Sequence, residues 1–252
     1  MISHIAVLEI LNQAQPELLK FIQIKGGVGL VFKLGLSNTR FTRDLDLTMP
    51  NRQSLLDALP TLFSYSWHGF SIGSSTIRPI YAPPGTPVEL AVQRIDLQLK
   101  FLETKWLTTR LDITQGVSIG TNVTRQILPH QEILLVLESL GLVASSSFNL
   151  ITAEFQVAQK LQAVSQFGSE RGRDLFDIYL LAARKNFNQV LCQRLLTQLA
   201  TSSTSPPNQR EITPTEVLAA SYLAAVNGLD APDFDTALDF CNQLLLFKHE
   251  GR

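Results

Sequence analysis

The chain is organised around residues 24–48, which read I-K-G-G-V-G-L-V-F-K-L-G-L-S-N-T-R-F-T-R-D-L-D-L-T. This segment opens on two adjacent glycines, Gly26 and Gly27, and closes on two carboxylates, Asp44 and Asp46. Residues two apart in a β-strand point to the same face, so these carboxylates would project together while the leucines beside them face a core. The pattern predicts a glycine turn, a short helix and a strand that carries paired acids.

Paired carboxylates repel each other unless a positive charge lies between them. A divalent cation with oxygen ligands is the usual partner, and Mg2+ bound to nucleotide phosphates fits that description. Glycines lack a Cβ atom, so their backbone N–H groups can approach phosphate oxygens closely. Together these features indicate metal-assisted nucleotidyl transfer. The alternative interpretation is a solvated strand edge with two acids on its outer face.

Bulk composition sets limits on the class of protein. The 252 residues are 45% hydrophobic and 17% charged, which is typical of a globular protein with one large or two modest domains. A net charge of −1 gives no overall basic field for nucleic acid, although a local patch can still grip an RNA.

The sequence also bears on the compartment. Its two cysteines show neither zinc spacing nor a disulfide framework, which favours a reducing compartment. The first residues predict a helix rather than a signal peptide, and no apolar run reaches the roughly 18–20 residues that span a bilayer. We therefore expect a soluble, cytoplasmic protein with no membrane partner.

The secondary-structure pattern changes along the chain. Up to residue 128 it mixes helices with strands. The strands are predicted at residues 21–24, 43–49, 70–81, 89–101 and 108–114, and the helices at 2–14, 16–21, 28–34 and 53–63. After residue 129 the strand signals fade, and residues 131–140 are apolar but ambiguous. Helices are then predicted at residues 152–167, 173–185, 188–199, 214–226 and 233–248, with a polar loop at 201–209.

This change predicts an α+β protein with two domains: a mixed sheet with flanking helices over residues 1–128, and a helical domain over 129–252. A third carboxylate would normally complete a two-acid site from a neighbouring strand. Asp96, in R-I-D-L-Q, and Asp112, in R-L-D-I-T, both qualify on the residues alone. The alternative for each is a salt bridge with the arginine two residues before it, Arg94 or Arg110.

A second group of charged residues lies in the helical part. Lys160 is predicted on one helix, and Asp174 and Asp177 open the next, close to Arg171 and Arg173. A lysine could supply the positive charge that nucleotide phosphates need. The alternative interpretation is that Asp174 simply favours the helix dipole from the first turn.

Five motifs in this order resemble one known family. K-G-G, R-F-T-R-D-L-D-L, R-L-D-I-T, A-Q-K-L-Q-A and R-G-R-D-L-F-D-I-Y-L-L are similar to the AbiEii/AbiGii-type nucleotidyltransferases over residues 21–181. Those proteins are toxins of type IV toxin–antitoxin and abortive-infection systems. They have a DNA polymerase β-like nucleotidyltransferase fold and a helical C-terminal domain. The family motifs fall on Lys25, Gly26, Gly27, Arg40, Thr42, Asp44, Asp46, Asp112, Lys160, Arg173, Asp174 and Asp177.

The resemblance implies a role for each of these positions. Asp44, Asp46 and Asp112 would hold two Mg2+ ions, and Asp112 would also activate the acceptor hydroxyl, which decides for it against Asp96. The glycine amides and Lys160 would steady the triphosphate. Asp174 would position Lys160 or the acceptor. The nucleotide-binding residues would be Lys25, Gly26, Gly27, Arg40, Thr42, Arg173 and Asp177.

The chain departs from the family pattern at two positions. Val28 replaces the small hydroxyl residue that usually follows the glycines, and Gln159 replaces the glutamate that usually precedes the lysine. The implied activity is Mg2+-dependent transfer of a nucleoside monophosphate from an NTP to an acceptor such as a tRNA 3′ end, with a cognate antitoxin as partner. The departures leave room for a non-catalytic module that binds NTP or a partner protein. A Mg2+ nuclease that uses the same carboxylates is a third alternative.

Overall fold

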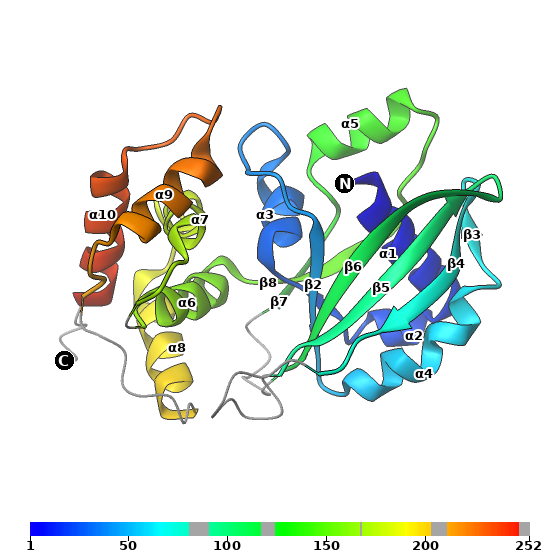
Figure 1. The fold of residues 1–252 in the computed structure, drawn as a ribbon, viewed down its shortest axis with the longest axis horizontal. Helices are drawn as coiled ribbons and strands as arrows, with labels where there is room; N and C mark the ends of the chain where they lie inside the picture. The colour runs from blue at the N-terminus through cyan, green and yellow to red at the C-terminus, as the bar shows by residue number, and fades with distance from the viewer. Residues whose placement is uncertain (81–90, 117–123, 167, 203–210, 247–252) are drawn as a thin grey trace. The chain divides into compact units, whose positions relative to one another are not determined.

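The computed structural model describes residues 1–80, 91–116, 124–166, 168–202 and 211–246 (Figure 1). The chain divides into two compact units, Met1–Ile151 and Thr152–Arg252. The first unit contains the sheet and the second is helical. The fold is therefore a mixed α and β one, as the sequence predicts.

The first unit is built on an eight-stranded sheet with the order β3-β4-β5-β6-β2-β1-β8-β7. Its strands are β1 (Gln23–Ile24), β2 (Asp44–Met49), β3 (Ser66–Trp67), β4 (Phe70–Ile77), β5 (Gln93–Phe101), β6 (Thr104–Gln115), β7 (Thr124–Ile127) and β8 (Phe148–Ile151). Its helices are α1 (Ile2–Ala14), α2 (Pro16–Leu19), α3 (Gly26–Leu34), α4 (Arg52–Leu62) and α5 (Gln131–Ser139). The β2–β6 and β1–β8 pairs are parallel and the other pairs are antiparallel, so the sheet is mixed.

The boundary between the units lies later than the expected one near residue 129. Strand β8 pairs in parallel with β1 and antiparallel with β7, so the segment that contains α5 belongs to the sheet unit. The sequence did not reveal this because β8 is only four residues long, which is too short for a periodic signal. The ambiguous residues 131–140 contain α5, which begins at Gln131, directly after its N-cap residue His130, and ends at Ser139.

Other element ends also differ from the expected ones. Helix α3 begins at the first glycine rather than at residue 28, β4 ends at Ile77, and β6 is longer than the predicted strand at both ends. Helix α8 continues to Ser202, into the predicted polar loop. Parts of five predicted elements lie outside the described residues. They are position 81 of the strand 70–81, positions 89–90 of the strand 89–101, position 167 of the helix 152–167, positions 203–209 of the polar loop, and positions 247–248 of the last helix.

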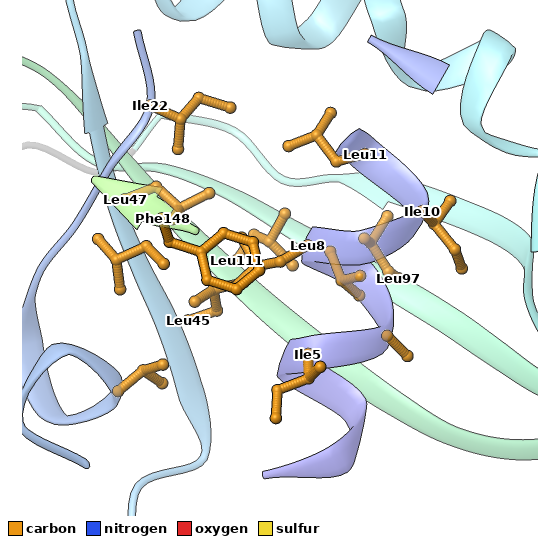
Figure 2. Packing of buried hydrophobic residues seen from close by; sticks show 14 of the residues in the cluster. Ile5, Leu8, Ile10, Leu11, Ile22, Leu45, Leu47, Leu97, Leu111 and Phe148 are labelled. Atoms are coloured by element: carbon orange, nitrogen blue, oxygen red, sulfur yellow. The ribbon is translucent and has the colours of Figure 1, made fainter. Parts of the chain in front are cut away.

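Alternation along the strands gives the sheet one apolar face. Leu45, Leu47 and Leu111 are fully or almost fully buried, and α1 contributes Ile5 and Leu8 to the same cluster. Figure 2 shows these side chains between the helix and the sheet. Each Å2 of apolar surface that is buried stabilises the fold by about 25 cal/mol. The apolar faces of β2 and β6 are therefore held against the core, and their opposite faces are left for polar side chains.

The second unit consists of helices α6 (Ala153–Val164), α7 (Gly172–Ala182), α8 (Gln189–Ser202), α9 (Glu216–Val226) and α10 (Phe234–Leu246). Helix α6 packs against α7 and α8, and α7 packs against α9 and α10. The contact between α7 and α9 is close, since a Cβ atom at Gly172 would lie 2.0 Å from the carbonyl oxygen of Leu218. Glycine at this position lets the two helix backbones approach each other.

Candidate active site

Strand register brings the three predicted carboxylates onto one face of the sheet. On β2 and β6, Asp46 lies opposite Asp112 and Asp44 lies opposite Arg110. Asp44 and Asp46 are two residues apart on β2, so both project from the face opposite the buried leucines. All three carboxylates are partly buried. The structure therefore places Asp44, Asp46 and Asp112 on adjacent strands, with their side chains on the same side.

The glycine turn lies directly against this acidic face. Gly26 has a φ of +62°, and a Cβ atom there would lie 2.0 Å from Oδ2 of Asp46. A Cβ atom at Gly27 would lie 2.7 Å from Oγ1 of Thr42. Both positions need glycine, one because of its backbone conformation and both because of the close contacts. As a result, the first turn of α3 lies beside the Asp46 carboxylate.

The lysine before the glycines is tied to the same strands. The backbone N–H of Lys25 donates to the carbonyl oxygen of Asp46 at 2.9 Å, and its Nζ donates to Oγ1 of Thr114 at 2.7 Å. Arg40 is partly buried in the connection between α3 and β2. These contacts place Lys25 at the edge of the acidic face. The nucleotide contacts of Lys25, Arg40 and Thr42 stay predictions.

Arginines on β5 and β6 neutralise part of the acidic face. Both oxygens of Asp112 accept hydrogen bonds from Arg94, at 2.8 Å from Nε and 2.6 Å from Nη2. The hydrogen bond with Asp112 raises the pKa of the Arg94 guanidinium above its ordinary value. Arg110 contacts Asp44 at 3.7 Å and Asp96 at 3.4 Å. Asp96 is also paired with Arg78, at 2.7 Å.

These pairs differ from the salt bridges considered in the sequence. Each R-x-D tripeptide places its arginine and aspartate on one strand, but the carboxylates pair with arginines across strands. Antiparallel register sets Arg94 opposite Asp112 and Asp96 opposite Arg110. The pairing of Arg94 with Asp112 was therefore not predicted from the sequence. The available signal was the repetition of R-x-D on two consecutive predicted strands, which pairs unlike charges when the strands run antiparallel.

The carboxylates can be tested for their fit to Mg2+. Among the residues that the structure describes, no three histidine, cysteine, aspartate or glutamate side chains gather closely enough to hold a metal ion. Mg2+, however, is commonly held by one or two carboxylates together with substrate phosphates. Asp44 and Asp46 fit that arrangement, with the first turn of α3 next to Asp46. Asp112, both of whose oxygens are held by Arg94, does not fit it in this conformation, and its role as a metal ligand stays a prediction.

The second predicted group forms a buried ion-pair network inside the helical unit. Nζ of Lys160 lies 2.5 Å from Oδ1 of Asp174 and 2.8 Å from Oδ2 of Asp177. Arg171 holds the second oxygen of Asp174 at 2.6 Å. The two aspartate side chains are 1% and 0% exposed. Arg173, also predicted to be part of the site, is exposed on α7.

The electrostatics of this network follow from its burial. Burial alone would lower the pKa of Lys160, but the charges of Asp174 and Asp177 and their hydrogen bonds outweigh it and raise the pKa. Burial likewise opposes the charge on Asp174, yet Lys160 and Arg171 hold its pKa well below the ordinary range. Lys160 and Asp174 are therefore both charged near neutral pH. The contact of Lys160 with a triphosphate stays a prediction.

A mixed sheet with a D-x-D strand beside a glycine turn, followed by a helical unit, is the arrangement of the nucleotidyltransferase class. A family model described as nucleotidyl transferase AbiEii toxin, type IV toxin–antitoxin system, matches residues 9–240. The chain belongs to this family. The resemblance found in the sequence is thereby confirmed.

One solved structure supports the fold. MenT4, a nucleotidyltransferase toxin from Mycobacterium tuberculosis H37Rv, is similar with a TM-score of 0.57 and 16% identity, over 98% of this chain and 92% of that one. The antibiotic-resistance factor ANT(2'')-Ia is more weakly similar, with a TM-score of 0.42 and 12% identity over 80% of this chain and 90% of that one. Among curated proteins, none matches the chain. Within the described residues, no helix has the length and apolar character to cross a membrane.

Proposed function

We propose that this protein transfers a nucleoside monophosphate from an NTP to a hydroxyl of an RNA acceptor, with Mg2+ held by Asp44 and Asp46. One observation carries the proposal: the Asp46 carboxylate lies against the first turn of α3, at the distance that only glycine allows. Oxygen ligands for a metal are thereby placed beside backbone N–H groups that can bind phosphate. Membership of the AbiEii family supports the same chemistry.

In the proposed transfer, each group of the site has a separate role. The N–H groups at Gly26 and Gly27 donate to oxygens of the triphosphate, and Asp112 orients the acceptor hydroxyl. The hydroxyl oxygen forms a bond to the α-phosphorus while the bond to the β-phosphate oxygen breaks, so pyrophosphate leaves and the hydroxyl proton passes to solvent. When bound, Mg2+ supplies positive charge that neutralises the phosphate oxygens. In-line displacement of this kind depends on positioning and electrostatics rather than on covalent catalysis by the protein.

We infer the biological setting from the family. A type IV toxin is paired with an antitoxin, and blocking a tRNA 3′ end would stop translation. We therefore propose tRNA as the acceptor and a cognate antitoxin protein as the partner.

The test is a labelling experiment with the purified protein, Mg2+, total tRNA and each of four α-32P-labelled NTPs. We expect label in RNA from at least one NTP. Asp44→Asn and Asp46→Asn should each lower the rate by about 10²–10³-fold or more, because each removes a charge that holds the metal against the phosphates. Asp57→Asn, at a hydrogen-bonded surface carboxylate of α4, is the matched control and should not change the rate.

Other outcomes would each redirect the assignment. Label in the protein alone would replace RNA with a protein acceptor. Shortened RNA would indicate a nuclease. NTP binding without any labelled product would indicate a non-catalytic module, and equal rates in wild type and Asp44→Asn would exclude the proposed site.

A further inference from the structure

Arg94 binds both carboxylate oxygens of Asp112, one of the three aspartates of the acidic face. The two groups make two parallel hydrogen bonds, the fork-to-fork geometry that fixes both the position and the rotation of a carboxylate. The Arg94 side chain is 42% exposed and that of Asp112 is 15% exposed. The pair is therefore accessible to water from the arginine side, and the aspartate is oriented by its partner on β5.

Asp112 has a second neighbour on its other side. It lies in register with Asp46 on β2, and neighbouring strands are about 4.7–4.9 Å apart. A cation held by Asp44 and Asp46 would therefore be a competing partner for the Asp112 carboxylate. The Arg94 side chain is 42% exposed and can be hydrated once it leaves, and the cation would replace its charge at Asp112, so the exchange costs the fold little.

The neighbouring arginine differs in its geometry. Arg110 makes longer contacts, 3.7 Å to Asp44 and 3.4 Å to Asp96, one oxygen of each carboxylate being involved. Arg110 therefore screens charge without fixing a carboxylate in one rotation. Arg94 instead fixes the orientation of Asp112.

We propose that Arg94 is a positioning residue that holds Asp112 against β5, so that the metal site begins with Asp44 and Asp46 and gains Asp112 only when the Arg94 fork releases it. The inference rests on the proposed function, because it takes Asp44 and Asp46 as the metal ligands. It adds a residue that acts through Asp112 rather than on the substrate. The released guanidinium becomes available to an anionic group of the substrate.

The experiment measures Mn2+ binding by electron paramagnetic resonance in the full chain without nucleotide, so that it does not depend on turnover. Arg94→Gln should tighten binding by about 10-fold, because the freed carboxylate adds a charged oxygen ligand to the ion. The same substitution in an Asp112→Asn background should have no effect. Arg78→Gln, which removes a positive charge from the same face but is paired with Asp96, should change binding by less than about 2-fold.

The Arg94→Lys variant distinguishes the effect of the two parallel hydrogen bonds from the effect of the positive charge. Lysine keeps the positive charge but cannot hold both oxygens, so the variant should retain most of the tightening. Wild-type affinity in Arg94→Lys, or equal tightening in the Asp112→Asn background, would show that only the lost charge matters and would overturn the positioning role. Unchanged or weaker binding in Arg94→Gln would overturn it as well.

The same measurement separates this inference from the proposed function. Mn2+ binding that survives Asp44→Ala would refute the proposed metal site, and the positioning role with it. Binding that is lost in Asp44→Ala but is indifferent to Arg94→Gln would refute the positioning role alone.

Discussion

The acidic face of the sheet and the Lys160 network of the helical unit are both built from aspartates paired with basic side chains, yet the carboxylates of the network are much more deeply buried. On the sheet, the side chains of Asp44 and Asp112 are 39% and 15% exposed. In the helical unit, Asp174 and Asp177 are almost completely buried. Exposed pairs can exchange partners with a ligand, whereas breaking a buried pair leaves an uncompensated charge. The same residue types therefore serve exchangeable contacts in one unit and a fixed structure in the other.

The largest expected effect comes from breaking the buried network. Lys160→Met leaves the two buried carboxylates without their ammonium group, so we expect a loss of about 3–5 kcal/mol in the free energy of unfolding of the helical unit. Arg94→Met, on the exposed face, should cost less than about 1 kcal/mol. Urea unfolding of both variants measures the difference.

Similar costs for the two variants would remove the distinction between the units. A Lys160→Met variant with unchanged stability but weakened NTP binding would instead support the predicted contact between Lys160 and the triphosphate.

A buried histidine in the sheet unit makes the stability of that unit depend on pH. His4 on α1 is 2% exposed, and its Nε2 lies 3.0 Å from the carbonyl oxygen of Arg43, next to Asp44. Burial lowers the pKa of His4 from 6.5 to about 4. The unfolded chain therefore takes up the proton first, so stability is full above pH 6.5 and falls as the pH drops towards 4.

The loss over that interval should reach about 3 kcal/mol, at 1.36 kcal/mol for each pKa unit. Urea unfolding between pH 7 and pH 4 should show the decline in wild type and a flatter curve in His4→Gln. Asp174 does not contribute in this interval, because its depressed pKa means that its stabilisation is lost only below its ordinary value of 3.8. An equal slope in both proteins would show that another group titrates.

The smallest expected effect lies at the outer edge of the acidic face. Arg78, 57% exposed, is paired with Asp96. Arg78→Gln should change the free energy of unfolding by less than about 1 kcal/mol, and 0.5 M NaCl should shrink the difference further. A salt-independent loss as large as that of Lys160→Met would show that exposure does not separate the two kinds of pair.

The sequence predicted what depends on local pattern. The D-x-D alternation on β2 and the glycines before α3 are short-range features, and each corresponds to an observed element. The pairing of Asp112 with Arg94 depends on β5 and β6 being antiparallel in one particular register, which long-range packing sets. Strand β8 was missed for a related reason, since four residues become a strand here by pairing with β1 and β7. The resemblance to a family added Asp112, which periodicity alone left level with Asp96.

Strand β1 gives the sheet a narrow seam. Its two residues, Gln23 and Ile24, pair with β2 on one side and with β8 on the other, so the sheet is continuous at this point through a very short segment. The next residues along the chain are Lys25 and the glycine turn. Opening of this seam would therefore separate β2 from β8 and detach the glycine turn from its support in one event. Amide hydrogen exchange at Ile24 would report how often the turn comes apart, and slowed exchange on adding NTP would show that the nucleotide closes the seam.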